Sequence, residues 1–390
     1  MRYKPFTYMQ TEISGAATPL KVVLGQLRYA VLDLDYTGSL IDQYNIAGTS
    51  LRSICKINNN SYLVGGVFTT IDGITRSNIA KIENGAVVTS GGWGGSGNTA
   101  GVQWIGRQST KNFIVKAGTG GTYNGTSVGE IFRIDSNGNL GPSFAISSSD
   151  GDSITGFCID SDDNLWMTGN PQIFKVNGVA YTKGIAKFDP NGNPITLISG
   201  SGFAPTNLTV TSIDNIGDKV FVAGSFTSYN GSTVGTGIIK LNSDGSVDTS
   251  FNVGAGMSGS LASFVPILKH LWKIGKVALI APGASDTRMA FYSGSAVKNF
   301  ALINLDGTLD SNFTVPPSAS QYSIKDNWID SDLQGNLYLC NAIKFNGVSF
   351  NNTSSNEFIK LDSTGSLASF DSSSFSTELS RFIDSVVVWG

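Results

Sequence analysis

The chain has 390 residues, a formal net charge of −3 and 14% charged residues, compared with roughly 25% in a typical soluble domain. Apolar residues make up 40% of it, which provides material for a packed core and argues against wholesale disorder. No block of lysine or arginine is present, and binding to a phosphate backbone depends on a concentrated basic face. We therefore expect no nucleic-acid partner.

Residues 1–18 contain Tyr3, Phe6 and Tyr8 but no repeated strand pattern. The segment lacks the apolar core of a secretory signal peptide, and no stretch of the chain approaches the roughly 18 apolar residues of a transmembrane helix. We expect an N-terminal arm without a cleaved export signal, and no membrane insertion. Its aromatic residues are candidate contacts with a partner, because exposed apolar patches commonly mark interfaces.

Residues 19–390 are dominated by a glycine turn with an apolar residue on each side. It occurs seven times, around Gly38, Gly85, Gly138, Gly192, Gly245, Gly307 and Gly365. Successive glycines lie 47, 53, 54, 53, 62 and 58 residues apart, and a regular period of this length is the signature of a repeat architecture. We therefore expect residues 19–390 to form one repeat domain.

The repeat at residues 209–251 shows the expected strands most clearly. Thr209–Ile213 alternates polar and apolar residues, as a half-buried strand does. Lys219–Ala223 is rich in branched and aromatic residues, which favour strands. Thr236–Leu241 and Ser246–Phe251 lie on either side of the glycine turn and complete the unit. Four short antiparallel strands in each unit predict the blade of a β-propeller.

A second turn recurs between the expected second and third strands as an Asn-Gly or Asp-Gly pair. Such pairs favour the positive φ angles that tight hairpins require. The copies are Asp72-Gly73, Asn124-Gly125, Asn177-Gly178, Asn230-Gly231 and Asn346-Gly347.

The two ends of the repeat domain complement each other. The first unit has no evident first strand, whereas Phe382–Trp389 has the pattern of a first strand with no unit after it. Joining the two would remove exposed strand edges. We therefore expect an all-β, seven-bladed β-propeller of four-stranded antiparallel blades, closed by pairing the C-terminal strand with the N-terminal blade.

Two segments carry the most distinctive repeat motif. Lys219–Phe226 is a strand that ends in Gly-Ser-Phe, and Ile238–Phe251 contains the run Asp-Gly-Ser-Val-Asp-Thr-Ser-Phe. Related runs occur at Tyr62–Thr69 and Leu305–Phe313. These segments resemble the delta-60 repeat of bacterial and phage β-propellers. The resemblance implies a propeller and a bacteriophage virion protein, and it brings no catalytic residues because its glycines and asparagines form turns.

His270 is the single histidine, so a two-histidine metal site is excluded and a hydrolytic triad would depend on this residue. It lies in the segment Val265–Lys273, which we interpret as an insertion that follows a first strand at Leu261–Phe264. We expect His270 to be an exposed-loop or packing residue. Together with Trp272 it is also a candidate partner contact.

Gly91–Gly97 is rich in glycine, but the Gly-Lys-Ser/Thr ending of a phosphate-binding loop is missing. The composition predicts a flexible connection between two blades. The alternative is an exposed contact tip that carries Trp93.

Asp135–Asn139 and Asp160–Asn164 have the alternating oxygen-bearing residues of calcium loops, but they lack the bidentate glutamate that closes such a loop. Asp and Asn also favour hairpin turns, because their side chains bond nearby backbone. Cys55, Cys158 and Cys340 lie far apart in strand-like runs, where a thiol acts as a small apolar side chain. We expect no disulfide framework, no metal and no cofactor.

Two classes of function remain. The first is a non-enzymatic structural or binding protein, most simply a virion component of a tail, fibre or capsid exterior. Such a protein would contact other virion proteins, a host receptor or a glycan, and a bacterial surface adhesin would share the binding role. The second is a carbohydrate-active hydrolase, which needs two carboxyl groups about 5–10 Å apart. The aspartates lie mostly in turn motifs, so we expect a virion location and no enzymatic activity.

Overall fold

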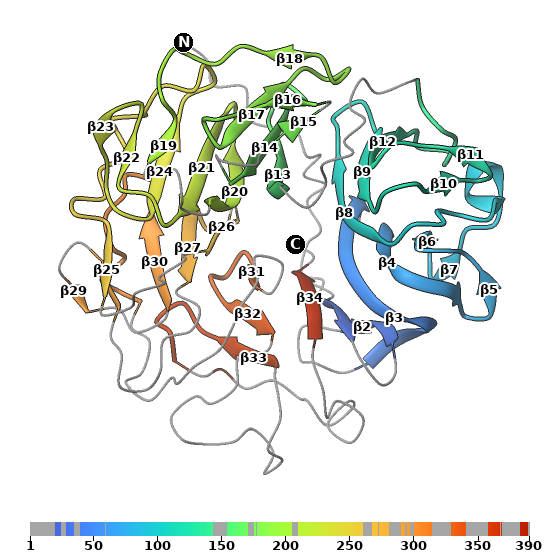
Figure 1. The fold of residues 1–390 in the computed structure, drawn as a ribbon. Helices are drawn as coiled ribbons and strands as arrows, with labels where there is room; N and C mark the ends of the chain where they lie inside the picture. Colours follow the sequence, from blue (N-terminus) through green and yellow to red (C-terminus); the bar gives the residue numbers. More distant parts are fainter. Residues whose placement is uncertain are drawn as a thin grey trace.

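The computed structural model describes an all-β chain (Figure 1). The described residues are 20–24, 29–34, 40–58, 60–142, 154–170, 175–176, 178–204, 210–259, 267–271, 273–280, 290–292, 295–296, 300–313, 329–340, 358–366, 368 and 383–388. The expected N-terminal arm with Tyr3, Phe6 and Tyr8 lies outside them, as does Trp272. In this part of the chain the single helix is a short 3-10 turn, η1 (Gly91–Gly94).

The largest sheet combines strands from both ends of the chain. Its eight strands, in spatial order with β5 paired to β4 only, are β34 (Ile383–Val388), β1 (Leu20–Leu24), β2 (Tyr29–Leu34), β3 (Leu40–Asn58), β4 (Ser61–Ile71), β5 (Ile74–Thr75), β6 (Ile79–Glu83) and β7 (Ala86–Val87). β34 runs antiparallel to β1. The long strand β3 pairs with β2 through its first part and with β4 through its later part.

Five sheets of three or four antiparallel strands follow along the chain. Their strands are β8 (Val102–Arg107), β9 (Phe113–Ala117) and β12 (Ile131–Ile134); β13 (Ile154–Ile159), β14 (Leu165–Gly169), β17 (Ile185–Phe188) and β18 (Pro194–Ile195); β20 (Val210–Ile216), β21 (Lys219–Gly224) and β24 (Ile238–Leu241); β26 (Ile267–Leu271), β27 (Lys276–Ile280) and β30 (Phe300–Asn304); and β31 (Ile329–Ser331), β32 (Leu337–Cys340) and β33 (Phe358–Leu361).

Short strands form four small additional sheets. They are β10 (Thr122–Tyr123) and β11 (Thr126–Ser127); β15 (Lys175–Val176) and β16 (Val179–Ala180); β19 (Phe203–Ala204), β22 (Ser228–Tyr229) and β23 (Ser232–Thr233); and β25 (Met257–Gly259), β28 (Ala290–Tyr292) and β29 (Ser295–Ala296).

The first strands of the successive sheets lie around a common centre (Figure 1). We call them the inner strands: the later part of β3, then β8, β13, β20, β26 and β31. Each inner strand contacts the next one along the chain, and β34 contacts both β31 and β3. The C-terminal strand is therefore part of the largest sheet and also contacts the last sheet.

Equivalent residues align across each inner strand and the next two strands of its sheet, and we call each alignment a cross-strand row. The rows are Cys55–Leu63–Lys81, Gly106–Ile114–Arg133, Cys158–Trp166–Lys187, Asp214–Phe221–Lys240, Lys269–Ala278–Leu302 and Asp330–Tyr338–Lys360. The third position is Lys or Arg in every row except the one that ends in Leu302. The first position differs from row to row.

The apolar core lies between neighbouring sheets. One cluster joins Cys158 and Trp166 of β13 and β14 to Val220 and Val222 of β21. Since each sheet packs on the next, a single repeat has no complete core of its own, as expected for a repeat array.

The predicted turns are confirmed in the described residues. The glycines of six glycine turns, from Gly85 to Gly365, have φ between +79° and +93°. Both residues of Asp72-Gly73, Asn124-Gly125 and Asn230-Gly231 also have positive φ, the geometry of a type I′ hairpin.

The expected fourth strands are much shorter than the sequence predicts. In the repeat at residues 209–251, the predicted strand Ser246–Phe251 is reduced to a single bridge between Leu241 and Val247. The reason is Asp248, whose carboxylate accepts a hydrogen bond from the Ser250 amide at 3.1 Å and turns the chain away from the sheet.

The predicted boundaries in the sixth repeat were also wrong. Ile267–Leu271, which we expected to lie in an insertion, is the inner strand β26; it pairs with β27 and contacts β20 and β31. The run Ile-Leu-Lys-His-Leu does not alternate apolar and polar residues, so the period-two pattern did not reveal it. The segment assigned to this strand, Leu261–Phe264, lies outside the described residues.

Candidate functional site

The glycine turns hold neighbouring sheets together. In three of the turns, a carbonyl accepts a hydrogen bond from a backbone amide that follows the preceding sheet. The three described examples are Gly92 to Asn137 at 3.0 Å, Ile198 to Asp244 at 2.9 Å and Asn252 to Asp306 at 2.7 Å.

Basic side chains at the ends of two cross-strand rows bond to the same turns. Arg133 Nη1 donates to the carbonyl of Pro190 at 3.0 Å, and Lys187 Nζ donates to the carbonyl of Ser243 at 2.9 Å. Pro190 and Ser243 occupy equivalent positions in successive glycine turns. The repeated basic residue therefore joins one sheet to the next.

Buried tyrosines contact the glycine turn of their own repeat. Tyr123 Oη donates to Gly138 O at 2.7 Å and Tyr229 Oη donates to Gly245 O at 2.9 Å. Burial raises the pKa of Tyr229 to about 12. Both hydroxyls are thus kept as neutral donors.

The aspartates with calcium-like spacing bond the backbone of their own turns. Asp135 Oδ1 accepts from the amides of Asn137 and Asn139 at 2.9 and 2.8 Å. Asp160 Oδ1 does the same in the Asp160–Asn164 turn. In the described part of the chain, no group of three or more His, Cys, Asp or Glu side chains is arranged to hold a metal ion.

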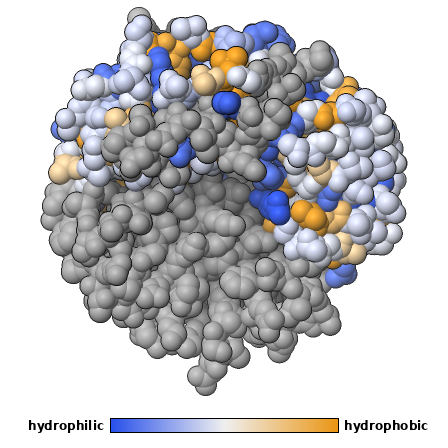
Figure 2. Space-filling view, viewed as in Figure 1, coloured by the Kyte–Doolittle hydropathy of each residue, from blue (hydrophilic) through white to orange (hydrophobic). Residues whose placement is uncertain are grey.

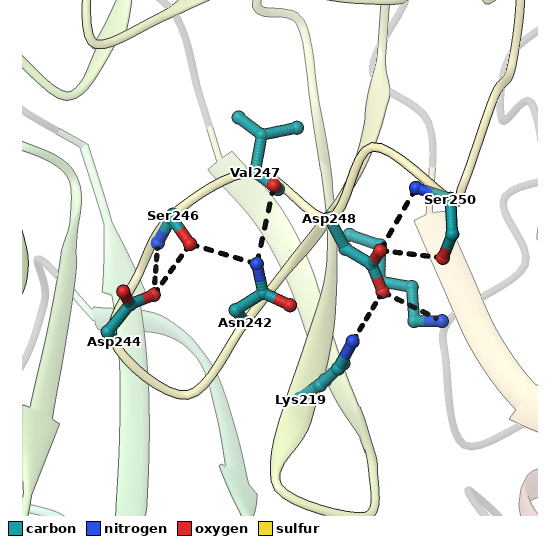
Figure 3. A network of polar contacts seen from close by, with 8 residues as sticks. Lys219, Asn242, Asp244, Ser246, Val247, Asp248 and Ser250 are labelled. Atoms are coloured by element: carbon teal, nitrogen blue, oxygen red, sulfur yellow. Dashed lines mark hydrogen bonds and ion pairs between the residues drawn. The ribbon is translucent and has the colours of Figure 1, made fainter.

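Asp248 is the centre of the polar network in Figure 3. Its Oδ2 lies 2.8 Å from Lys219 Nζ and 3.2 Å from Lys240 Nζ, and its Oδ1 accepts from Ser250 Oγ at 2.6 Å. Burial alone would raise the pKa of this carboxyl, but the bonds from Lys219 and Ser250 hold it well below its usual range. The network fixes the end of the repeat to the sheet.

Charged residues of a different kind lie on the inner strands. Asp214 of β20 pairs with Lys269 of β26 at 3.2 Å, and Asp330 of β31 pairs with Lys273, just after β26, at 3.3 Å. Lys56 of β3 interacts electrostatically with Lys273 and Asp330. We call these five residues the axial charged cluster.

Burial and a neighbouring lysine both affect the pKa of Lys56 in the axial charged cluster. Burial lowers the pKa of Lys56 to about 8, Lys273 lowers it further and Asp330 opposes the shift. The Lys269 side chain is 35% exposed, whereas the Lys273 side chain is only 2% exposed. Of these two lysines, Lys269 is therefore the one whose side chain is accessible to solvent.

Sequence reasoning missed the axial charged cluster. The available signal was a charged residue within the strand-like runs Ser53–Ile57, Thr209–Ile216 and Ile329–Ser331. Only the pairing register showed that Asp214, Lys269 and Asp330 share one position of successive cross-strand rows.

Trp93 is buried, with 4% of its surface exposed. Its Nε1 donates to Ser136 O at 3.2 Å, and its ring meets Phe113 edge-on at a centroid distance of 6.5 Å. The hypothesis of an exposed contact tip at Trp93 is therefore wrong. The flexible connection expected at Gly91–Gly97 is instead bonded to the following repeat.

His270 lies half-buried in β26. Its Nδ1 is 2.8 Å from Asn215 O, and its ring is 5.7 Å from that of Phe221. Burial lowers its pKa, while Asp214 opposes the shift. These contacts fit a packing residue, and a role in partner contact stays a prediction.

Cys55 and Cys158 are buried free thiols. Burial raises the pKa of Cys55 to about 12 and that of Cys158 well above its usual value. The expected role as small apolar residues is consistent with their place in the core clusters.

Figure 2 shows one face of the molecule. Among the described residues on it, hydrophobic side chains lie in separate groups, and strongly hydrophilic ones gather beside the centre. No helix in the described part of the chain is long and apolar enough to cross a membrane.

Solved structures that are similar to this chain include the following three. The WD40 β-propeller domain of Doa1 is 12% identical with a TM-score of 0.45, and the match covers 84% of this chain and 91% of that one. The GH74 enzyme of Niastella koreensis is 12% identical with a TM-score of 0.43, covering 91% and 54%. The extracellular domain of a putative one-component system from B. thetaiotaomicron is 13% identical with a TM-score of 0.41, covering 84% and 38%.

This chain therefore spans less than two thirds of the length of the last two structures. Among curated proteins, no sequence matches the chain.

One family model matches a single repeat. Residues 218–251 match a domain of unknown function (DUF5122) beta-propeller. The match contains Lys219, Lys240, Asp248 and Ser250, the residues of the network in Figure 3. The chain thus contains a β-propeller repeat whose matched residues include those that hold the repeat together.

Proposed function

We propose that the chain forms a seven-bladed β-propeller closed by β34. The support is the order of contacts among the inner strands, with β34 between β31 and β3 and paired to β1. Closure leaves no inner sheet edge exposed.

Deletion of residues 383–390 tests the closure. We expect a large fall in melting temperature, because β1 and two neighbouring sheets lose their partner. Deletion of residues 1–18 is the control and is expected to have a smaller effect. Equal melting of the full chain and the 383–390 deletion would refute closure by β34.

We propose further that the propeller is a non-enzymatic binding platform, and that the axial charged cluster takes part in partner contact. The observation that carries this proposal is the contrast within the cross-strand rows: the third position is basic in five of the six rows, whereas the first position holds Cys, Gly, Asp or Lys. Binding residues are commonly placed on a rigid scaffold at positions the scaffold itself does not need.

The resemblance to phage and bacterial repeat proteins supports a place in a virion, in a tail, fibre or capsid exterior. Mass spectrometry of purified virions tests this setting, and we expect the intact chain among the virion proteins. Its absence from virions together with its presence on the bacterial surface would favour an adhesin instead.

Substitutions in the cluster test the site. Lys56→Met and Lys269→Met together should weaken attachment of the labelled chain to host cells at least tenfold if the cluster contacts the partner. Lys111→Met, at an exposed hairpin of the third repeat, is the matched control and should leave attachment unchanged. Equal attachment of the double variant and the control would show that the axial charged cluster does not contact the partner.

A hydrolase is the second candidate, because Asp214 and Asp330 lie at the same row position of two inner strands. Glycosidases use two such carboxyl groups. Against this candidate, each carboxylate is ion-paired with a lysine. The hydrolase would be favoured over the binding platform if the parent chain released sugars from host-surface glycan and if both Asp214→Asn and Asp330→Asn abolished this release.

A further inference from the structure

Five described Asn-Gly pairs differ in how firmly the asparagine is held. Asparagine followed by glycine can lose its side-chain amide spontaneously, since glycine offers little hindrance to attack by its backbone nitrogen. The pairs are Asn84-Gly85, Asn124-Gly125, Asn137-Gly138, Asn191-Gly192 and Asn230-Gly231.

Two of these asparagines use their side chains to join neighbouring loops. Asn124 Oδ1 accepts from the Gly97 amide at 2.9 Å and its Nδ2 donates to Gly92 O at 2.7 Å. Asn230 Oδ1 accepts from the Gly202 amide at 2.8 Å. Attack on the side-chain carbon would first have to break these bonds.

At Asn137 and Asn191 the backbone is held instead. The Gly192 amide, the nucleophile for Asn191, donates to Asp189 O at 2.9 Å. The amide of Gly138, which would be the nucleophile, donates to Asp135 O at 3.0 Å, and the Asn137 carbonyl accepts from Gly92. The Gly138 backbone also lies directly against Trp93. The rotation that brings the nitrogen to the side chain is therefore opposed.

Asn84 has none of these restraints. It is exposed, with φ +48°, in the two-residue hairpin between β6 and β7. Its backbone amide donates to Asn60 O at 2.8 Å, but within the described residues its side chain makes no hydrogen bond. The hairpin lies at the outer edge of its sheet, where local opening costs little.

We infer that Asn84 is a site of spontaneous deamidation in the folded protein, and that Asn124, Asn137, Asn191 and Asn230 are protected by the fold. The Gly85 nitrogen loses its proton to solvent and forms a bond to Asn84 Cγ. The C–N bond of the side-chain amide breaks and ammonia leaves, which gives a cyclic imide. Water then opens the ring to aspartate or isoaspartate, which adds one negative charge and, in isoaspartate, one extra backbone carbon to the hairpin.

Peptide mapping of the folded chain tests the inference, because trypsin places the five sites in separate peptides, 82–107, 117–133, 134–175, 188–219 and 220–240. After incubation in heavy-oxygen water at neutral and mildly alkaline pH, we expect the 82–107 peptide to gain the label at least ten times faster than the other four. Asn84→Gln should abolish that labelling without changing the other peptides.

Incubation of the chain unfolded in urea is the matched control. There the five sites should react at rates within a few-fold of one another, because only the Asn-Gly sequence remains. Labelling of Asn124 or Asn230 as fast as Asn84 in the folded chain would overturn the inference, and so would an unlabelled Asn84.

Discussion

The glycine turns and the axial charged cluster are both polar, but their residues recur in opposite ways. Several turns use similar groups in the same positions: in three, a carbonyl bonded to the preceding sheet, and in some repeats a tyrosine hydroxyl or a basic side chain bonded to the turn. The first row position holds Cys, Gly, Cys, Asp, Lys and Asp in six successive sheets. The comparison shows that the repeat preserves what joins one sheet to the next and leaves the inner strands free to vary.

Substitutions in the two regions should therefore have different consequences. Changes in the repeated contacts should lower the stability of the whole array, whereas changes at the exposed part of the axial charged cluster should alter binding with little loss of stability.

Asp160→Ala should have the largest effect. Asp160 is 1% exposed and its carboxylate lies 3.3 Å from the buried Lys187 Nζ. Removing one partner of a buried ion pair costs about 3–5 kcal/mol because the other charge is left buried. Urea denaturation measures the loss, and exposed Asp162→Ala is the control. A loss no greater than that of the control would show that Lys187 does not depend on this carboxylate.

Gly138→Ala should cost more than Gly125→Ala in the same repeat. Both glycines have φ near +80°, so both substitutions carry the left-handed backbone penalty of roughly 1–2 kcal/mol. Only at Gly138 would the new Cβ lie about 2.5 Å from Trp93, whereas at Gly125 no atom lies within 4 Å. Thermal melting should separate the two variants. Equal melting temperatures would mean that the contact with Trp93 relaxes without cost.

Tyr123→Phe and Tyr229→Phe should each lower the free energy of unfolding by about 1–2 kcal/mol, because each leaves a buried turn carbonyl without its donor. Since the two tyrosines bond equivalent glycine carbonyls, the losses should be similar. Strongly unequal losses would indicate that the repeats do not use the turn in the same way.

Acid should weaken the network around Asp248. Its folded pKa lies below its unfolded value, so it contributes stability above the unfolded pKa of about 4, and that contribution is lost as the pH falls toward the folded pKa. Asp248→Asn should be less stable than the parent at neutral pH and should show a shallower decline in acid. Parallel pH profiles of stability would contradict this assignment.

Lys269→Met should have the smallest effect on stability, less than about 1 kcal/mol, because partly exposed ion pairs contribute little. Its side chain is 35% exposed and that of its partner Asp214 is 17% exposed. Chemical denaturation should place it near Lys111→Met. A loss of stability as large as that of Asp160→Ala would show that the axial charged cluster contributes to stability as much as the repeated contacts do.

Much of the scaffold could be predicted from local sequence. The glycines with φ near +80° and the Asn-Gly hairpins occur where the sequence placed them, because positive φ is a local property of glycine and asparagine. The fourth strand was overestimated since Asp248 bonds Ser250 rather than continuing the ladder. β26 was missed because its apolar and polar residues do not alternate.

By itself, therefore, the sequence determined the repeat, its turns and the all-β class, which depend on contacts between residues close in the chain. The tertiary structure decided that Trp93 is buried against the next repeat, and that Asp214, Lys269 and Asp330 occupy one position of neighbouring inner strands. These residues lie about one repeat apart in the chain. Their proximity follows from how the sheets pack and not from any local pattern.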